Sequence, residues 1–155
     1  MENKERSNRL APVKAYIFKK GLSMAELSRR CKKDLSRHGI SYRMRMGDCS
    51  LEDMEDMAQA AGYRFAWHWE DVRPVEPSKR SVRPMTKLNN DRLKPVLEYL
   101  FLKNISIPDL ANKLGITRGG LAFRLKEGSC MMSDMEEMAD AAGYRFVWDW
   151  EELSV

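Results

Sequence analysis

Apolar positions recur at helical spacing between residues 110 and 128, where the sequence is LANKLGITRGGLAFRLKEG. Leu110 and Leu114 lie four residues apart, which places them on one face of a helix. Gly115 is suited to end that helix, because a glycine after the last turn adopts positive φ without strain. Thr117 is a good N-cap for a second helix, in which leucines recur at the same spacing. The pattern therefore predicts a short helix, a tight turn and a second helix.

The chain contains an internal duplication. Residues 9–13 (RLAPV) return as 92–96 (RLKPV), and residues 60–65 (AAGYRF) return as 141–146, at offsets of 83 and 81. The first copy therefore has two extra residues, which fall near 31–35, where the glycine of the tight turn is missing. We expect a longer turn there.

The duplication predicts a mainly α-helical fold with two tandem units. We divide the chain into a first repeat at residues 1–71, a basic, proline-containing linker at 72–90 and a second repeat at 91–155. Each repeat should contain four helices. The expected helices are about 8–20, from 23, 36–46 and about 50–61 in the first repeat, and about 91–103, from 106, 117–127 and about 132–142 in the second.

The period of the pattern changes after the last helix of each repeat. Tyr63, Phe65, Trp67 and Trp69 alternate with less apolar residues, and aromatic residues alternate in the same way at 144–150. Strict period two with aromatic residues on one face predicts a strand. Because a strand is unstable alone, we expect the two strands to pair and to bury their aromatic faces. Pairing within the chain makes an internal pseudo-dimer, whereas pairing between two chains makes a homodimer.

Opposite charges gather in different parts of each repeat, although the whole chain has a formal net charge of only +4. Residues 27–45 include seven basic residues and one acidic residue, and residues 110–126 include four basic residues and no acidic one. Residues 48–71 and 127–152 instead have net charges of −6 and −7. Such segregation is typical of a protein with one surface facing nucleic acid and another facing solvent or a partner. The larger positive charge of the first repeat predicts that it holds the DNA backbone more strongly.

The spacing of residues 110–128 resembles the helix-turn-helix of the Cro and phage-repressor type, over about 55 residues. The resemblance implies lambda-repressor-like units in which the second motif helix enters the major groove and the first crosses the DNA backbone. It places bases near Thr117, Arg118, Gly119, Ala122 and Phe123 in the second repeat, and near Ser36, Arg37, His38, Ser41 and Tyr42 in the first.

Charge adds further candidate DNA contacts to both motifs. They are Arg29, Arg30, Lys32, Lys33, Arg43 and Arg45 in the first repeat, and Lys113, Arg124 and Lys126 in the second. Arginine can bind guanine with two hydrogen bonds. We expect Arg118 and Arg124 to lie at or near the bases, because the second repeat has the better-formed turn.

The linker combines basic residues with prolines, which keep a chain extended. Two interpretations of it remain open. One is a solvated tether, and the other is an arm that follows DNA phosphates or enters a minor groove. In the second case Lys79, Arg80 and Arg83 are candidate phosphate contacts.

Motifs of enzymes and of metal sites were not found. The sequence has no P-loop, no GxSxG and no HExxH, and its two histidines lie in different elements. Three cysteines without a CxxC pair argue against a disulfide framework or a zinc site. The acidic cluster at 52–56 we interpret as charge at a helix N-terminus. We expect no enzymatic activity, no cofactor, no metal, no membrane segment and no small-molecule substrate.

These features predict a transcriptional regulator that binds double-stranded DNA in a sequence-specific manner. We expect a repressor of phage or mobile-element type in the cytoplasm of a bacterial or phage-infected cell. The alternative is a protein-binding module on the same scaffold, for instance a phage-encoded inhibitor of a host nuclease or defence system, similar to anti-CRISPR proteins. In that case the acidic, aromatic side would contact the partner protein.

Overall fold

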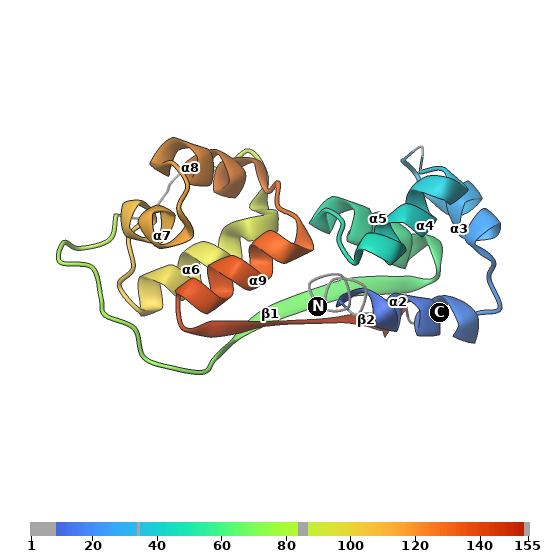
Figure 1. Cartoon of the computed structure of the whole chain (residues 1–155), viewed down its shortest axis with the longest axis horizontal. Coiled ribbons are helices and arrows are strands. Elements are labelled where there is room, and N and C mark those ends of the chain that lie inside the picture. The colour runs from blue at the N-terminus through green and yellow to red at the C-terminus, as the bar shows by residue number, and fades with distance from the viewer. Residues whose placement is uncertain (1–8, 34, 84–86, 154–155) are drawn as a thin grey trace. The chain divides into compact units, whose positions relative to one another are not determined.

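The computed structural model describes residues 9–33, 35–83 and 87–153. Within them the chain forms eight α-helices and two β-strands, with a short 3₁₀ helix, η1 (Asp91–Leu93), before the helices of the second repeat (Figure 1). The residues divide into two compact units. The first unit takes residues 9–66 and 148–153, and the second takes residues 67–147.

Four helices of the first unit begin at residues suited to capping or to a first turn. They are α2 (Ala11–Lys19), α3 (Met24–Arg30), α4 (Arg37–Met46) and α5 (Leu51–Ala60). Pro12 lies in the first turn of α2, where no backbone N–H is needed. Ser23, Ser36 and Ser50 cap the other three helices, each hydroxyl accepting the N–H three residues on at 3.0–3.1 Å. The helices predicted for the first repeat are therefore confirmed.

The second unit repeats this plan. Its helices are α6 (Lys94–Leu102), α7 (Ile107–Leu114), α8 (Arg118–Glu127) and α9 (Met132–Ala141). The Ser106 hydroxyl accepts the N–H of Asp109 at 3.2 Å and caps α7. The Thr117 hydroxyl accepts the N–H of Gly120 at 3.0 Å and caps α8. The helices predicted for the second repeat are confirmed as well.

The core of each unit is built from equivalent positions, with methionines as filling residues. In the first unit Leu27, Ile40, Met54 and Met57 are buried, and in the second Leu110, Leu121, Met135 and Met138 take their places. Methionine fills irregular gaps because its side chain is flexible and polarizable. These buried methionines therefore belong to the cores.

The two strands, β1 (Tyr63–Asp71) and β2 (Tyr144–Glu152), pair antiparallel in one two-stranded sheet. Phe65 faces Trp148 and Trp67 faces Phe146, with ring centroids 6.1 and 6.0 Å apart. Aromatic pairs across strands stabilise a sheet beyond the area they bury. The predicted pairing of the strands within one chain is thus confirmed, whereas the predicted burial of the aromatic faces is only partial. Four central aromatic side chains are half-buried, namely Phe65, Trp67, Phe146 and Trp148.

Each compact unit is completed by a tryptophan from the other sequence repeat. In the first unit Trp150 of β2 stacks on Tyr16 of α2 at 5.5 Å and also contacts Tyr63.

In the second unit Trp69 of β1 stacks on Tyr99 of α6 at 5.5 Å and also contacts Tyr144. The two indole rings are almost fully buried. The compact units thus divide both strands near their middle, whereas the predicted domains end each repeat with its own strand.

The described part of the linker lies on the second unit. The N–H of Ser78 donates to the carbonyl of Asn104 at 2.8 Å, and the Ser78 hydroxyl accepts the N–H of Ser106 at 2.8 Å. Further along, the N–H of Asn89 donates to the carbonyl of Lys126 at 2.9 Å. These bonds fix the linker along α7 and α8, so a fully solvated tether does not describe it.

Candidate nucleic-acid interface

The outward face of α8 is open to solvent at its N-terminus. Arg118 and Gly119 are exposed, Ala122 is half-buried, and Phe123 is 62% exposed. Among the described residues, apart from its chain neighbours and the backbone of α8 itself, nothing lies within 4 Å of the position that a Cβ of Gly119 would take. Another molecule can therefore approach the backbone of this helix closely.

The turn before α8 has the geometry that its glycine requires. Gly115 has φ of +70°, in the left-handed region, and follows directly on α7. Its N–H donates to the carbonyl of Asn112 at 3.2 Å, and that of Ile116 donates to the carbonyl of Ala111 at 3.1 Å. Because these bonds satisfy the last carbonyls of α7, only residues 115–117 are needed before α8 begins.

The corresponding turn in the first unit is longer, as predicted, and uses another device. It runs from residue 31 to residue 36. Asp56 of α5 accepts the backbone N–H groups of Lys32 and Lys33, both at 2.9 Å. Cys31 lies half-buried beside this carboxylate, and burial, aided by Asp56, raises the pKa of its thiol to about 11. In the first unit, which lacks the turn glycine, a carboxylate of α5 thus stabilises the turn by accepting two of its backbone N–H groups.

The candidate residues of α4 lie at its solvent face. Arg37, His38, Ser41 and Tyr42 are exposed, and the Ser36 hydroxyl caps the helix. The Arg45 guanidinium lies 5.9 Å from the centroid of the Tyr42 ring, a cation–π contact. The first unit therefore presents a polar helix end equivalent to that of α8, with His38 in the place of Gly119.

Two of the candidate arginines are instead engaged inside their units. The Nε of Arg43 donates to Asp53 at 3.0 Å, and a terminal nitrogen donates to the carbonyl of Gly39 at 2.9 Å. In the second unit Arg124 pairs with Asp134 at 3.6 Å. Each arginine joins α4 or α8 to the last helix of its repeat, so fewer of its donors are available to a ligand.

Lys33 is also paired, with Glu52 at 3.0 Å and with Asp53 at 3.6 Å. The hydrogen bond to Glu52 raises the pKa of the Lys33 ammonium group. Within the described residues, other candidate cations have no carboxylate within ion-pair distance. They are Arg29, Arg30, Lys32, Arg37 and Arg45 in the first unit, and Lys79, Arg80, Arg83, Lys113, Arg118 and Lys126 in the second.

The acidic residues of α5 therefore have structural partners beside the basic motif. Glu52, Asp53 and Asp56 contact side chains or amides of residues 32–43. In the second unit Asp140 pairs with Arg73 at 3.1 Å, and Asp134 accepts the N–H of Met131 at 3.1 Å. The acidic cluster at 52–56 does more than supply charge at a helix N-terminus.

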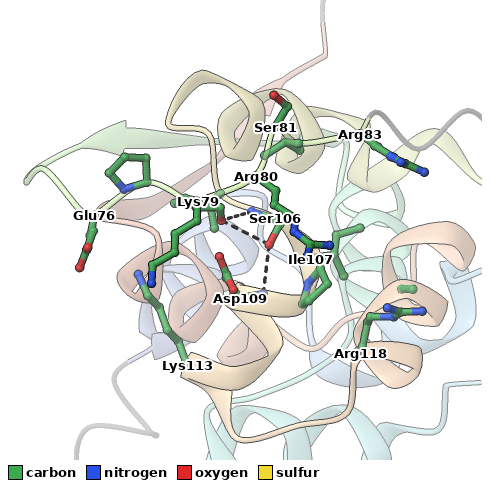
Figure 2. Close-up of a pocket in the computed structure, with 16 residues that line it drawn as sticks. Glu76, Lys79, Arg80, Ser81, Arg83, Ser106, Ile107, Asp109, Lys113 and Arg118 are labelled. Carbon is green, nitrogen blue, oxygen red and sulfur yellow. Dashed lines mark hydrogen bonds between the residues drawn. The ribbon is translucent and has the colours of Figure 1, made fainter.

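The linker bases lie beside the α7–α8 pair, around one hollow of about 1310 Å³ (Figure 2). Residues 76–83 form one wall. Ser106, Asp109 and Lys113 of the α7 region and Arg118 of α8 line the remainder. The structure thus brings Lys79, Arg80 and Arg83 together with two candidate residues of the second motif.

Over the described ranges, no group of three or more histidine, cysteine, aspartate or glutamate side chains is placed to hold a metal ion. No described helix is both long and apolar enough to cross a membrane. Cys31, Cys49 and Cys130 are free thiols. Compared with protein-family models, curated proteins and solved structures, the chain shows no match.

Sequence reasoning did not reveal three features of this region. These are the pairing of Arg43 and Arg124, the capture of two amides by Asp56, and the hollow at the linker. The first had a signal in the repeat itself, because Arg43 with Asp53 returns as Arg124 with Asp134 at the same offset. The hollow had no signal in the sequence, because it forms only where the linker lies against the second unit.

Proposed function

We propose that this chain is a sequence-specific double-stranded DNA-binding transcriptional regulator of phage or mobile-element type, acting as a repressor in the cytoplasm. In this proposal α3–α4 and α7–α8 are helix-turn-helix motifs, and α4 and α8 enter the major groove of DNA. The two motifs of one chain take the places of the two subunits of a dimer.

One observation carries the proposal. The N-terminal ends of α4 and α8 are exposed, and each begins with an unpaired arginine, Arg37 or Arg118, next to a capping hydroxyl. Residues near the N-terminus of a recognition helix contact base edges in the major groove. Arginine binds guanine there with two hydrogen bonds, and Ser and Thr hydroxyls bind bases or phosphates.

Cations near these helices that form no ion pair within the described residues would contact phosphates. Arg29 and Arg30 lie in the last turn of α3 and Lys32 follows it, whereas Lys113 lies in the last turn of α7 and Lys126 in that of α8. The linker's Lys79, Arg80 and Arg83 lie beside α8 and extend its basic surface. We assign Arg43 and Arg124 a smaller contribution to DNA binding, because they already form ion pairs with Asp53 and Asp134.

The alternative, a protein-binding module, has less support from the contacts. It requires the acidic, aromatic side of the chain to be available to a partner. Asp53, Asp56 and Asp134 are instead engaged with neighbouring groups, and Trp69 and Trp150 are buried.

Selection of binding sites from random duplexes, followed by titration of the selected duplex, tests the proposal. We expect one preferred site, with affinity that falls as salt is raised. The double variant Arg37→Ala/Arg118→Ala should bind that site at least roughly tenfold more weakly. The control Lys14→Ala/Lys19→Ala removes two exposed charges of α2 and should bind as the wild type does. No binding to any duplex at low salt would contradict the proposal.

A further inference from the structure

The hollow beside the linker lies wholly within the second unit. The volume of about 1310 Å³ exceeds what a drug-sized ligand fills, because pockets for such ligands measure roughly 300–1,000 Å³. Figure 2 shows the side chains of Lys79 and Lys113 ending at the left of the view and Arg118 at the right. A small molecule therefore has room beside the chain of the linker.

Positive charge dominates the lining. Five basic residues line the hollow, Lys79, Arg80, Arg83, Lys113 and Arg118, against the two acidic residues Glu76 and Asp109. Within the described residues neither carboxylate comes within ion-pair distance of any of the five. Like charges facing one space repel, and an anion bound between them removes that repulsion. The charge favours a ligand with more than one negative group.

Two backbone amides beside the hollow are already hydrogen-bonded, and a third lining residue has no N–H. The N–H of Ser106 is bound by the Ser78 hydroxyl at 2.8 Å, and that of Asp109 by the Ser106 hydroxyl at 3.2 Å. Pro108 has no N–H. An anion would thus be held by the lysine and arginine side chains, which form charge-assisted hydrogen bonds with phosphate.

Another part of the lining is apolar. Val82, Ile105, Ile107 and Ala122 contribute side chains, together with Pro77 and Pro108. Apolar surface next to cationic groups fits a ligand with an uncharged ring system as well as phosphates.

We propose that the hollow binds a small ligand with two or more phosphate groups and an apolar moiety, such as a nucleoside diphosphate. Arg118 lines the hollow and also begins the exposed end of α8. The ligand therefore competes with DNA for Arg118 and lowers DNA affinity. This competition, unlike ligand binding itself, rests on the proposed function.

Calorimetric titration of the full chain at low salt with adenosine diphosphate, and separately with inorganic pyrophosphate, tests ligand binding. Lys79→Gln/Arg80→Gln should weaken binding of both probes roughly ten- to hundredfold, because it removes two charge-assisted contacts. Both side chains are exposed, so the fold should persist. The control Lys14→Gln/Lys19→Gln removes the same charge from α2 and should bind both probes as the wild type does. Absence of binding to the wild type, or equal binding to both double variants, overturns the proposal.

A second arm separates the free ligand from DNA as the source of phosphate. Adenosine diphosphate should displace a fluorescent duplex from the wild type and displace it less readily from Lys79→Gln/Arg80→Gln. If that variant loses DNA affinity while the wild type binds neither probe, the hollow serves the DNA backbone, and the small-ligand proposal is overturned. If the wild type binds the probes but no DNA, the proposed function fails while the ligand site stands. Simultaneous binding of probe and duplex overturns the competition.

Discussion

The α3–α4 and α7–α8 helix pairs share one plan, but their turns are held by different means. In the second unit Gly115 adopts a left-handed conformation, and the turn satisfies its own hydrogen bonds. In the first unit Asp56 of α5 reaches over and binds two amides of a longer turn. The left-handed conformation of a glycine in one turn is thus replaced, in the other, by hydrogen bonds to a carboxylate of a third helix. The turn of the first pair therefore depends on α5, whereas the turn of the second pair is held by its own backbone hydrogen bonds.

The same contrast applies to charge. Residues 27–45 have the larger formal charge, but the α5 acids engage Lys33 and Arg43. The second pair starts with fewer bases and gains those of the linker, which lies against it. Formal charge therefore exaggerates the difference between the two units in their capacity to bind phosphate.

Replacing the exchanged tryptophans should have the largest effects and should affect the two units separately. Trp150→Ala should destabilise the first unit, and Trp69→Ala the second, by about 3–5 kcal/mol each, because a large buried ring leaves a cavity. Denaturant titration with hydrogen exchange measures both the loss and its location. The exchange of tryptophans between the repeats predicts that Trp150→Ala lowers hydrogen-exchange protection in the helices of the first repeat, and Trp69→Ala in those of the second. The opposite pattern would contradict this exchange.

Two controls accompany these variants. Phe18 of α2 is 85% exposed, so Phe18→Ala should change stability by less than about 0.5 kcal/mol. Within the described residues neither buried indole N–H has a hydrogen-bond acceptor. Trp150→Phe and Trp69→Phe should therefore cost much less than the alanine variants, since they keep a ring and remove an unsatisfied donor.

Removing charge clusters should test the balance between the two units. Each lost phosphate contact should reduce the slope of log K against log salt by about 0.9 on duplex DNA. We expect Arg29→Gln/Arg30→Gln/Lys32→Gln and Lys79→Gln/Arg80→Gln/Arg83→Gln to flatten the slope to a similar extent, by up to about 3. Anisotropy titrations at several salt concentrations measure it. A change confined to the first triple variant would show that the linker does not contact DNA.

The substitution Asp56→Ala should disturb the first pair and leave the second intact. It removes two hydrogen bonds from exposed amides of the turn to a charged carboxylate, which should cost about 1–3 kcal/mol. Glu137 is the equivalent residue in the second repeat and is exposed, so Glu137→Ala should cost less than about 0.5 kcal/mol. Denaturant titration compares the two variants. Equal losses would mean that Asp56 does not hold the turn.

The substitution Gly115→Ala should have a smaller effect, in the second pair. An alanine in the left-handed conformation costs about 1–2 kcal/mol. No atom lies within 4 Å of the added Cβ, so the cost should come from the backbone alone. Gly119→Ala, with equally open space and an ordinary helical φ, should instead stabilise the protein by about 0.4–1 kcal/mol. Thermal unfolding of the two variants should give shifts of opposite sign.

The sequence was sufficient to predict the local structure but not the contacts between distant segments. Capping residues, the glycine after α7 and the period-two aromatics are local signals, and the helices and paired strands they predicted are present. Trp69 and Trp150 each pack on a helix of the other sequence repeat. No local sequence pattern encodes such a contact between distant segments.

The candidate site shows the same limit. Exposure of Arg37 and Arg118 follows from helix periodicity, and the structure has both at the surface. The partners of Lys33 and Arg43 lie on α5, and the hollow depends on a linker fixed by Ser78. Charge alone does not distinguish a cation that faces solvent from one that is paired inside the fold.

Binding of Arg118→Ala to the selected duplex and to an unrelated duplex tests the central claim most directly. Lys126→Ala is the matched control, since Lys126 is an exposed cation at the other end of α8. We predict that Arg118→Ala loses about 1–3 kcal/mol on the selected duplex and much less on the unrelated one. Lys126→Ala should weaken both duplexes alike. Equal losses on the two duplexes for Arg118→Ala would contradict sequence reading by α8.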